Sequence, residues 1–167
     1  KVINTKKGKP VLALPNISTN CDENIEVDGS ICALISEIFT LNGEEFFKLK
    51  INNDCFGLLK VKHYKGYGFK VGGIVSCKYL GSNPDGSAKI EPINPNYTIG
   101  DIYKFKVEGF QEITDIENDT VIIAEVLDVS NRKCGVKLPN KVYLKGQTIN
   151  CKVTGYRKGR PQLEISE

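Results

Sequence analysis

The chain has 167 residues, of which 40% are apolar, and it carries a formal net charge of +3 at pH 7. This composition is typical of one or two compact globular domains, and no apolar run reaches the roughly 18 residues that a membrane-spanning helix needs. We therefore expect a cytoplasmic protein with no membrane partner. A net charge this small does not by itself indicate nucleic-acid binding, because a basic footprint is usually a strong local excess.

The first 15 residues, KVINTKKGKPVLALP, are similar to KVTGYRKGRPQLEIS near the other end of the chain. The match pairs Lys7 with Lys158 and Gly8 with Gly159. Internal similarity of this kind is the signature of repeated units. We predict that residues 1–15 are the terminal hairpin of a preceding repeat, and that the chain is part of a larger protein.

A first complete unit is predicted at residues 27–92, after a linker at residues 16–26. Phe47, Leu49 and Ile51 alternate with polar or outward-facing residues, which is the period of a half-buried strand. An Asn-Gly pair just before this segment predicts a hairpin turn. No stretch sustains helical periodicity, so at most one turn of helix is expected between the third and fourth strands.

A second unit is predicted at residues 98–167, after a short Pro-containing linker at residues 93–97. The segment VGGIVSCKYLG matches KGQTINCKVTG without a gap, so that Cys77 corresponds to Cys151. A further match pairs CFGLLK with CGVKLP and predicts that Cys55 corresponds to Cys134. Each unit carries the signals of five short strands separated by turns rich in Gly, Asn, Asp and Pro.

The second unit also contains motifs that point to a known family. They are the third-strand ending Gly135 to Leu138, the Lys145-Gly146 pair, and the closing sequence GRPQLEIS at residues 159–166. With this order of strands, the chain resembles the S-one type RNA-binding domain, an OB-fold module named for a ribosomal protein. The resemblance implies an all-β chain of two tandem five-stranded OB-fold barrels, preceded by a β-hairpin from a partial repeat, that binds RNA.

A basic and aromatic segment, KVKHYKGYGFK at residues 60–70, is the sharpest functional signal in the sequence. A protein that binds single strands needs cations for phosphates and flat rings on which bases stack. Outward-facing residues of the second predicted strand extend this surface, and a second basic region lies on the last hairpin. An alternative interpretation is that the aromatic residues plug the open end of a barrel while the lysines stay solvated. The predicted nucleic-acid-binding residues are Phe46, Lys48, Lys50, Lys60, Lys62, His63, Tyr64, Tyr67, Arg157, Lys158 and Arg160.

Charge is distributed unevenly along the second unit. Eight acidic residues lie between Asp101 and Asp128, whereas none lies between Val129 and Leu163. The six cysteines lack metal-ligand spacing, and we expect them to be buried thiols that act as small hydrophobic residues. A disulfide framework is the alternative.

Catalysis is not expected from this sequence, nor is any cofactor or metal. The only histidine, His63, has no acid or nucleophile fixed beside it, and no Gly-rich phosphate loop is present. Two functions remain. The first is a non-catalytic module that binds single-stranded nucleic acid, RNA before DNA because of the family resemblance. The second is a protein-interaction or spacer array that contacts other domains of its parent protein, which the acidic front of the second unit favours.

Overall fold

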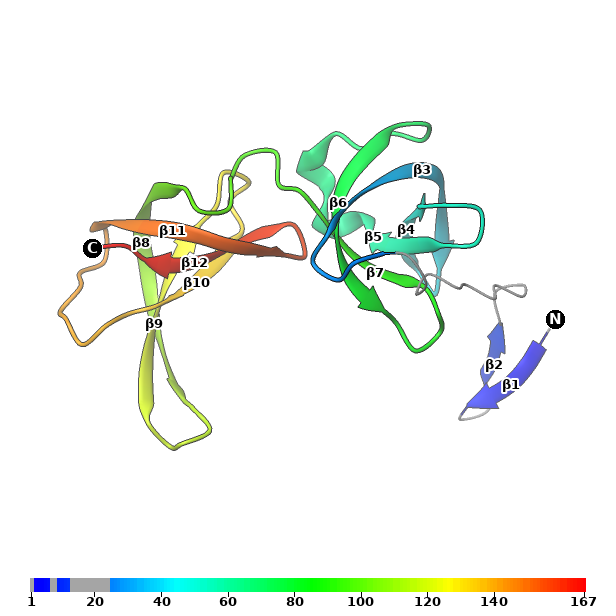
Figure 1. Cartoon of the computed structure of the whole chain (residues 1–167). Helices are drawn as coiled ribbons and strands as arrows, with labels where there is room; N and C mark the ends of the chain where they lie inside the picture. The colour runs from blue at the N-terminus through cyan, green and yellow to red at the C-terminus, as the bar shows by residue number, and fades with distance from the viewer. Residues whose placement is uncertain (1, 7–8, 13–24) are drawn as a thin grey trace. The chain divides into compact units, whose positions relative to one another are not determined.

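A computed structural model describes residues 2–6, 9–12 and 25–167 of the chain, and these residues form mainly β-strands (Figure 1). Strands β1 (Val2–Lys6) and β2 (Lys9–Leu12) pair antiparallel near the N-terminus. The assignment of this pair to a preceding repeat stays a prediction. Most of the linker expected at residues 16–26 lies outside the described residues.

The first barrel is a closed sheet with the strand order β3-β4-β5-β7-β6. Strand β3 pairs antiparallel with β4 and β6, and β4 pairs antiparallel with β5, whereas β5 and β7 run parallel. Two short 3₁₀ helices, η1 (Val61–His63) and η2 (Lys65–Tyr67), lie between the third and fourth strands, where the sequence allowed a single helical turn. The strands are β3 (Ser30–Leu41), β4 (Glu44–Lys50), β5 (Phe56–Lys60), β6 (Ile74–Ser82) and β7 (Ala88–Pro92).

The second barrel repeats this topology with the order β10-β12-β11-β8-β9. When the five strands of each barrel are numbered in chain order, their order around both barrels is 1-2-3-5-4, and strand 4 pairs with strand 1. This is the arrangement of an OB fold. The predicted fold class, all-β with two tandem five-stranded barrels, is therefore confirmed. The strands are β8 (Ile102–Thr114), β9 (Thr120–Leu127), β10 (Lys133–Lys137), β11 (Thr148–Arg157) and β12 (Arg160–Ile165).

Each barrel is filled by the inward residues of its alternating strands. Leu49 and Cys77 are completely buried in the first barrel, as are Val126 and Cys151 in the second. The long first strand of each barrel bends at the same place, since the register shifts between Ile35 and Glu37 in β3 and between Val107 and Gly109 in β8. Such bulges let one strand curve around a barrel and pair with a neighbour on each side.

Two compact units make up the chain. One consists of the residues up to 61 together with residues 69–90, and the other consists of residues 62–68 and 91–167. The short segment at residues 62–68 therefore belongs by its contacts to the second unit, although it lies between β5 and β6 in the sequence. In the described part of the chain, no helix is both long enough and apolar enough to cross a membrane.

The strand register corrects one of the predicted correspondences between units. Cys77 lies opposite Ile31 and Cys151 opposite Tyr103, at equivalent places ahead of the bulges, so their predicted match is confirmed. The match of Cys55 with Cys134 is wrong. Cys134 lies within β10 opposite Val126, and the equivalent residue of the first barrel is Gly57, which lies opposite Leu49. Cys55 lies before the start of β5.

The cysteines differ in their surroundings more than the sequence predicted. Cys77, Cys134 and Cys151 are buried thiols, as expected. Cys32 is an exposed thiol on β3, and Cys55 is buried and disulfide-bonded, so the expectation of buried thiols is wrong for these two. Cys21 lies outside the described residues.

Candidate nucleic-acid interface

The outward residues of β4 and β5 come together on one face of the first barrel. Phe46 lies directly opposite Lys60, and Lys50 lies opposite Phe56, in the antiparallel register of the two strands. Lys48 lies between them on the same side of β4, because residues two apart on a strand share a face. Four of the predicted site residues, Phe46, Lys48, Lys50 and Lys60, are thus brought to one surface.

Two further rings on this surface were not identified from the sequence. Phe39 on β3 pairs with Phe46 and stacks on it, with ring centroids 5.8 Å apart and an interplanar angle of 20°. The Lys48 ammonium nitrogen lies 4.9 Å from the centre of the Phe56 ring, within the range of a cation–π contact. All three rings are half-buried, so each is held by packing and keeps part of its area open to solvent. We call this set, Phe39, Phe46, Phe56, Lys48, Lys50 and Lys60, the aromatic face.

The lysines of the aromatic face are only lightly neutralised. Lys48 pairs with Glu37 at 3.3 Å, and Lys60 pairs with Glu44 at 2.6 Å. These lysine side chains keep 33% and 42% of their area exposed, and exposed ion pairs contribute little free energy. Lys50 is exposed, and its ammonium group pairs with no acid among the described residues. Phosphate oxygens can therefore replace the carboxylates at small cost.

Tyr64 and Tyr67 make internal contacts within the second unit. Tyr64 is only 4% exposed, and its hydroxyl donates to the Glu91 carboxylate at 3.1 Å. The Tyr67 hydroxyl donates to the main-chain carbonyl of Gly159 at 3.0 Å, and burial raises the pKa of Tyr67. Burial likewise raises the pKa of Glu91 above its ordinary value. In this structure the ring of Tyr64 packs inside the unit and presents no open face to a base.

The other residues predicted in this segment differ in exposure. Lys62 is exposed and His63 is half-buried. The main-chain carbonyl of His63 accepts a hydrogen bond from Arg132 Nη1 at 2.7 Å. The backbone of this segment is thus held within the second unit, while the Lys62 side chain faces solvent.

The predicted basic hairpin is the tight turn between β11 and β12. Lys158 and Gly159 both have positive φ, 51° and 74°, which matches the two-residue turn preferred between twisted antiparallel strands. Only glycine fits at the second position, because an added Cβ would lie 2.3 Å from the His63 carbonyl oxygen. Arg157 and Arg160 lie opposite each other on either side of this turn, and both are exposed.

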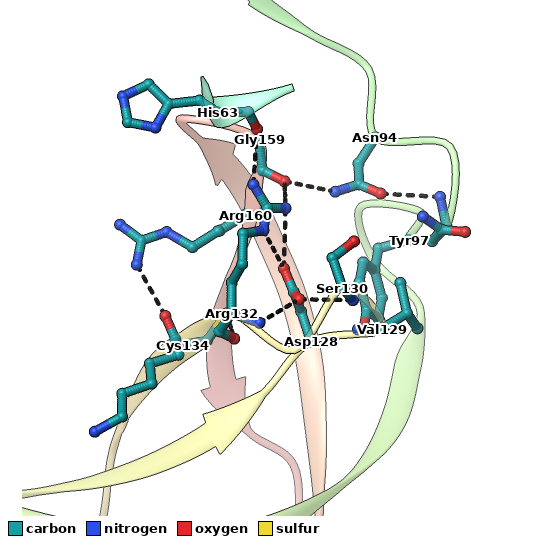
Figure 2. Close-up of polar contacts among 12 residues, drawn as sticks. His63, Asn94, Tyr97, Asp128, Val129, Ser130, Arg132, Cys134, Gly159 and Arg160 are labelled. Atoms are coloured by element: carbon teal, nitrogen blue, oxygen red, sulfur yellow. Dashed lines mark hydrogen bonds and ion pairs between the residues drawn. The ribbon is translucent and has the colours of Figure 1, made fainter. Parts of the chain in front are cut away.

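Arg132 holds the surroundings of this turn together (Figure 2). Its guanidinium donates to Asp128 Oδ2 from Nε at 3.0 Å and to the Gly159 carbonyl from Nη2 at 2.5 Å. Asp128 is only 4% exposed and also accepts from the main-chain N–H groups of Ser130 and Arg132. The charge of Arg132 is therefore used inside the protein, a role that the sequence did not indicate.

The corresponding face of the second barrel has different chemistry. Gln111 on β8 takes the place of Phe39, and its partner Ile123 on β9 takes the place of Phe46. Lys133 occupies the position of Phe56, since each begins the third strand opposite the end of the second. Glu125 stands where the first barrel has Lys48, and it binds both Gln111 Nε2 at 2.6 Å and Lys133 Nζ at 3.1 Å. No aromatic ring occupies any of these positions in the second barrel.

Among the residues that the structure describes, no cluster of three or more His, Cys, Asp or Glu side chains is placed to hold a metal ion.

Comparison with known proteins gives no family for this chain. No family model matches it, and no curated protein matches it. Among solved structures, one is described as a multidomain protein with nucleic acid binding domains from Streptococcus pneumoniae, with 13% identity and a TM-score of 0.30. The alignment covers 85% of this chain and 53% of that one, so this chain spans about half the length of its match.

Two other solved structures are similar to the same degree. A murine DNA binding protein bound with double-stranded DNA is 14% identical, with a TM-score of 0.26 and coverage of 81% of this chain and 93% of its own. The p204 HINb domain is 13% identical, with a TM-score of 0.29 and coverage of 84% and 94%. Scores this low carry no argument about what this chain binds.

Proposed function

We propose that this chain is a non-catalytic module that binds single-stranded nucleic acid through the aromatic face of its first barrel. The observation that carries the proposal is the gathering of three partly open rings and three lysines on the outer side of β3, β4 and β5. The outer side of the second and third strands is the usual oligonucleotide surface of OB folds.

The chemistry of the face fits unpaired bases. Stacking of a base on an aromatic ring contributes roughly 1–3 kcal/mol, and every base offers a flat surface for it. The lysines supply cations for the phosphates between the stacked bases. Binding then releases the counterions that surround those phosphates. The set contains no Asn, Gln or Arg to read base edges, so binding is expected to tolerate most sequences.

RNA is the proposed natural ligand because of the resemblance to the S-one type RNA-binding domain. The aromatic face itself supplies stacking and charge, which both RNA and DNA single strands satisfy. Parallel titrations with oligouridine and oligothymidine of equal length test this preference. Tighter binding of oligothymidine would contradict it while leaving single-strand binding in place.

The proposal is tested by fluorescence anisotropy of a labelled oligouridine with the full chain over a range of salt concentrations. Phe46→Leu combined with Phe56→Leu removes two rings but keeps apolar side chains, so the barrel is expected to remain folded. We expect this double variant to lose about tenfold or more in affinity, equivalent to one or two weakened stacks.

A matched charge comparison uses two pairs of lysines in the first unit. Lys50→Gln with Lys60→Gln is expected to weaken binding and to lower its salt dependence. Lys70→Gln with Lys78→Gln changes the same number of charges away from β4 and β5, since Lys78 lies on β6 opposite Ser30, and is expected to leave both unchanged. Absence of binding at low salt, or equal losses in the two pairs, would contradict the proposal.

Protein interaction is a second candidate function, favoured by exposed apolar side chains near the β8–β9 hairpin. Ile116 is fully exposed and Val142 is 90% exposed. Phe110, Ile122 and Val142 line a groove of about 550 Å³. Under this function, Phe110→Ser with Ile122→Ser abolishes binding of a purified neighbouring domain of the parent protein and leaves oligonucleotide affinity unchanged. Unchanged domain binding would exclude this surface.

A further inference from the structure

A groove opens in the second barrel where β10 and β12 separate. These two strands run parallel, but their register pairs only Val136 with Leu163 and Lys137 with Glu164. The first three residues of β10 and the first three of β12 therefore have no ladder contact with each other. A cavity of about 550 Å³ lies in this place.

Four cations line the groove: Lys133, Lys137, Arg157 and Arg160. None of the described residues that line it is acidic, and the nearby carboxylate of Glu125 pairs with Lys133 alone among these cations, at 3.1 Å. The exposed side chains of Thr154 and Gln162 add polar groups to the walls. The groove thus carries an excess of positive charge.

The cations of the groove are held in different ways. Figure 2 shows the Arg160 guanidinium reaching the strand that begins at residue 133, where it donates to the Lys133 carbonyl at 2.9 Å. This bond spans the gap between the strands and fixes one cation on the wall. Lys137 and Arg157 are exposed, and within residues 25–167 their charged groups make no hydrogen bond or ion pair. They are therefore available to a ligand without loss of an internal contact.

We infer that this groove binds the phosphate groups of a polyanion and makes no contact with bases. Arginine and lysine donors in a concave site suit phosphate oxygens, because charge-assisted hydrogen bonds are the strongest that such groups make. The described residues that line the groove include no aromatic ring, and Gly135 stands where the first barrel has Leu58 on its third strand. The ligand chemistry is therefore a row of phosphates, supplied by a sugar-phosphate backbone or by inorganic polyphosphate.

The inference is independent of the proposed function, since it depends on other residues in the other unit. It is tested with the full chain and two probes, an abasic deoxyribose-phosphate oligomer and inorganic polyphosphate of similar charge. Lys137→Gln with Arg157→Gln removes two groove cations that make no internal contact. Lys104→Gln with Lys106→Gln is the control, because it removes two exposed cations of β8 on the same barrel.

We expect the groove variant to bind the probes at least about tenfold more weakly, with a salt slope lower by about 1.4 for two lost phosphate contacts on a single strand. The control variant is expected to bind as the unchanged chain does. Binding of the abasic oligomer alone identifies the sugar-phosphate backbone as the source, and binding of polyphosphate alone identifies free polyphosphate. Failure of both probes to bind, or equal losses in both variants, would overturn the inference.

The outcome is separable from that of the aromatic face. Phe46→Leu with Phe56→Leu is expected to leave the binding of both probes unchanged, because neither probe contains a base.

Discussion

The two barrels share a topology and a bulge position, yet their matching outer faces have diverged. Where the first barrel has Phe39 and Phe46, the second has Gln111 and Ile123. The inward positions of the same strands remain small or apolar in both, as they are at Leu49 and Val126. Packing constrains every second residue of a strand, whereas the outward residues are free to change with the ligand.

The charged residues at equivalent positions of the two outer faces differ as well. Lys48 of the first barrel corresponds to Glu125 of the second, while Lys60 corresponds to Lys137. Four cations of the second barrel, Lys133, Lys137, Arg157 and Arg160, line the gap between β10 and β12. The first barrel thus carries aromatic rings and lysines together on its outer face, whereas the groove of the second barrel is lined by cations without rings among the described residues.

The largest expected effect comes from removing a buried side chain beneath the aromatic face of the first barrel. Leu49 is completely buried on β4, directly beneath the lysines of the aromatic face. Leu49→Ala is expected to lower the free energy of unfolding by about 2–5 kcal/mol, because it leaves a cavity in the core. Urea denaturation measures this loss, and Lys89→Ala, at an exposed position, is the control. If Leu49→Ala lowers the free energy of unfolding no more than the control does, the packing of Leu49 does not stabilise the strand that carries the aromatic face.

Replacing a ring by the residue of the other barrel is expected to have the next largest effect. Phe46→Ile gives the first barrel the residue type that the second barrel has at the equivalent position, Ile123. Loss of one stacking platform is expected to cost roughly 1–3 kcal/mol of binding free energy with an oligouridine. Binding of the abasic oligomer is expected to remain the same. An equal loss with both ligands would mean that the ring acts by supporting the fold.

A smaller effect is expected when the charge of the other barrel is introduced. Lys48→Glu gives the first barrel the residue type of position 125 and places two carboxylates together, since Lys48 now pairs with Glu37 at 3.3 Å. We expect weaker oligouridine binding and a salt slope lower by about 0.7, the value for one lost phosphate contact on a single strand. A salt titration checks this, with Lys78→Glu as the matched control, because Lys78 also pairs with an acid, Asp28, at 3.7 Å. An unchanged slope would remove Lys48 from the phosphate contacts.

The last expected effect appears only at alkaline pH and concerns two buried thiols in the core of the second barrel. Burial raises the pKa of Cys134 and of Cys151 to about 11. Because the same thiols ionise at lower pH in the unfolded chain, the free energy of unfolding should fall as the pH rises from about 9 to about 11. Cys134→Ala with Cys151→Ala is expected to flatten this part of the pH dependence in urea denaturation. An identical pH dependence in the variant would show that these thiols do not contribute.

Local patterns in the sequence were sufficient to predict the barrels and part of the aromatic face. The alternation around Phe47, Leu49 and Ile51 placed Lys48 and Lys50 outward on one strand. Phe39 was missed because the bulge between Ile35 and Glu37 changes the face of every later residue of β3. A strict period of two along the whole strand assigns those residues to the wrong side.

Other features depend on contacts between residues far apart in the sequence. Arg132 joins Asp128 to Gly159, and the groove depends on where the register of β10 and β12 ends. Tyr64 looked like an exposed aromatic residue in a basic segment, but its hydroxyl bonds to Glu91, which is 27 positions away. No local spacing predicts such pairings, because they arise only when the barrel closes.

The division of chemistry between the barrels is tested most directly by NMR of the phenylalanine rings of the full chain during titration with oligouridine. We expect shifts of the Phe39, Phe46 and Phe56 ring signals and none at Phe105, which is 4% exposed in the core of the second barrel. The abasic oligomer is expected to cause smaller shifts of the three rings on the aromatic face, because it reaches the lysines but offers no base to stack. Ring signals of the aromatic face that do not move with oligouridine, or that move equally with the abasic oligomer, would contradict base stacking on this face.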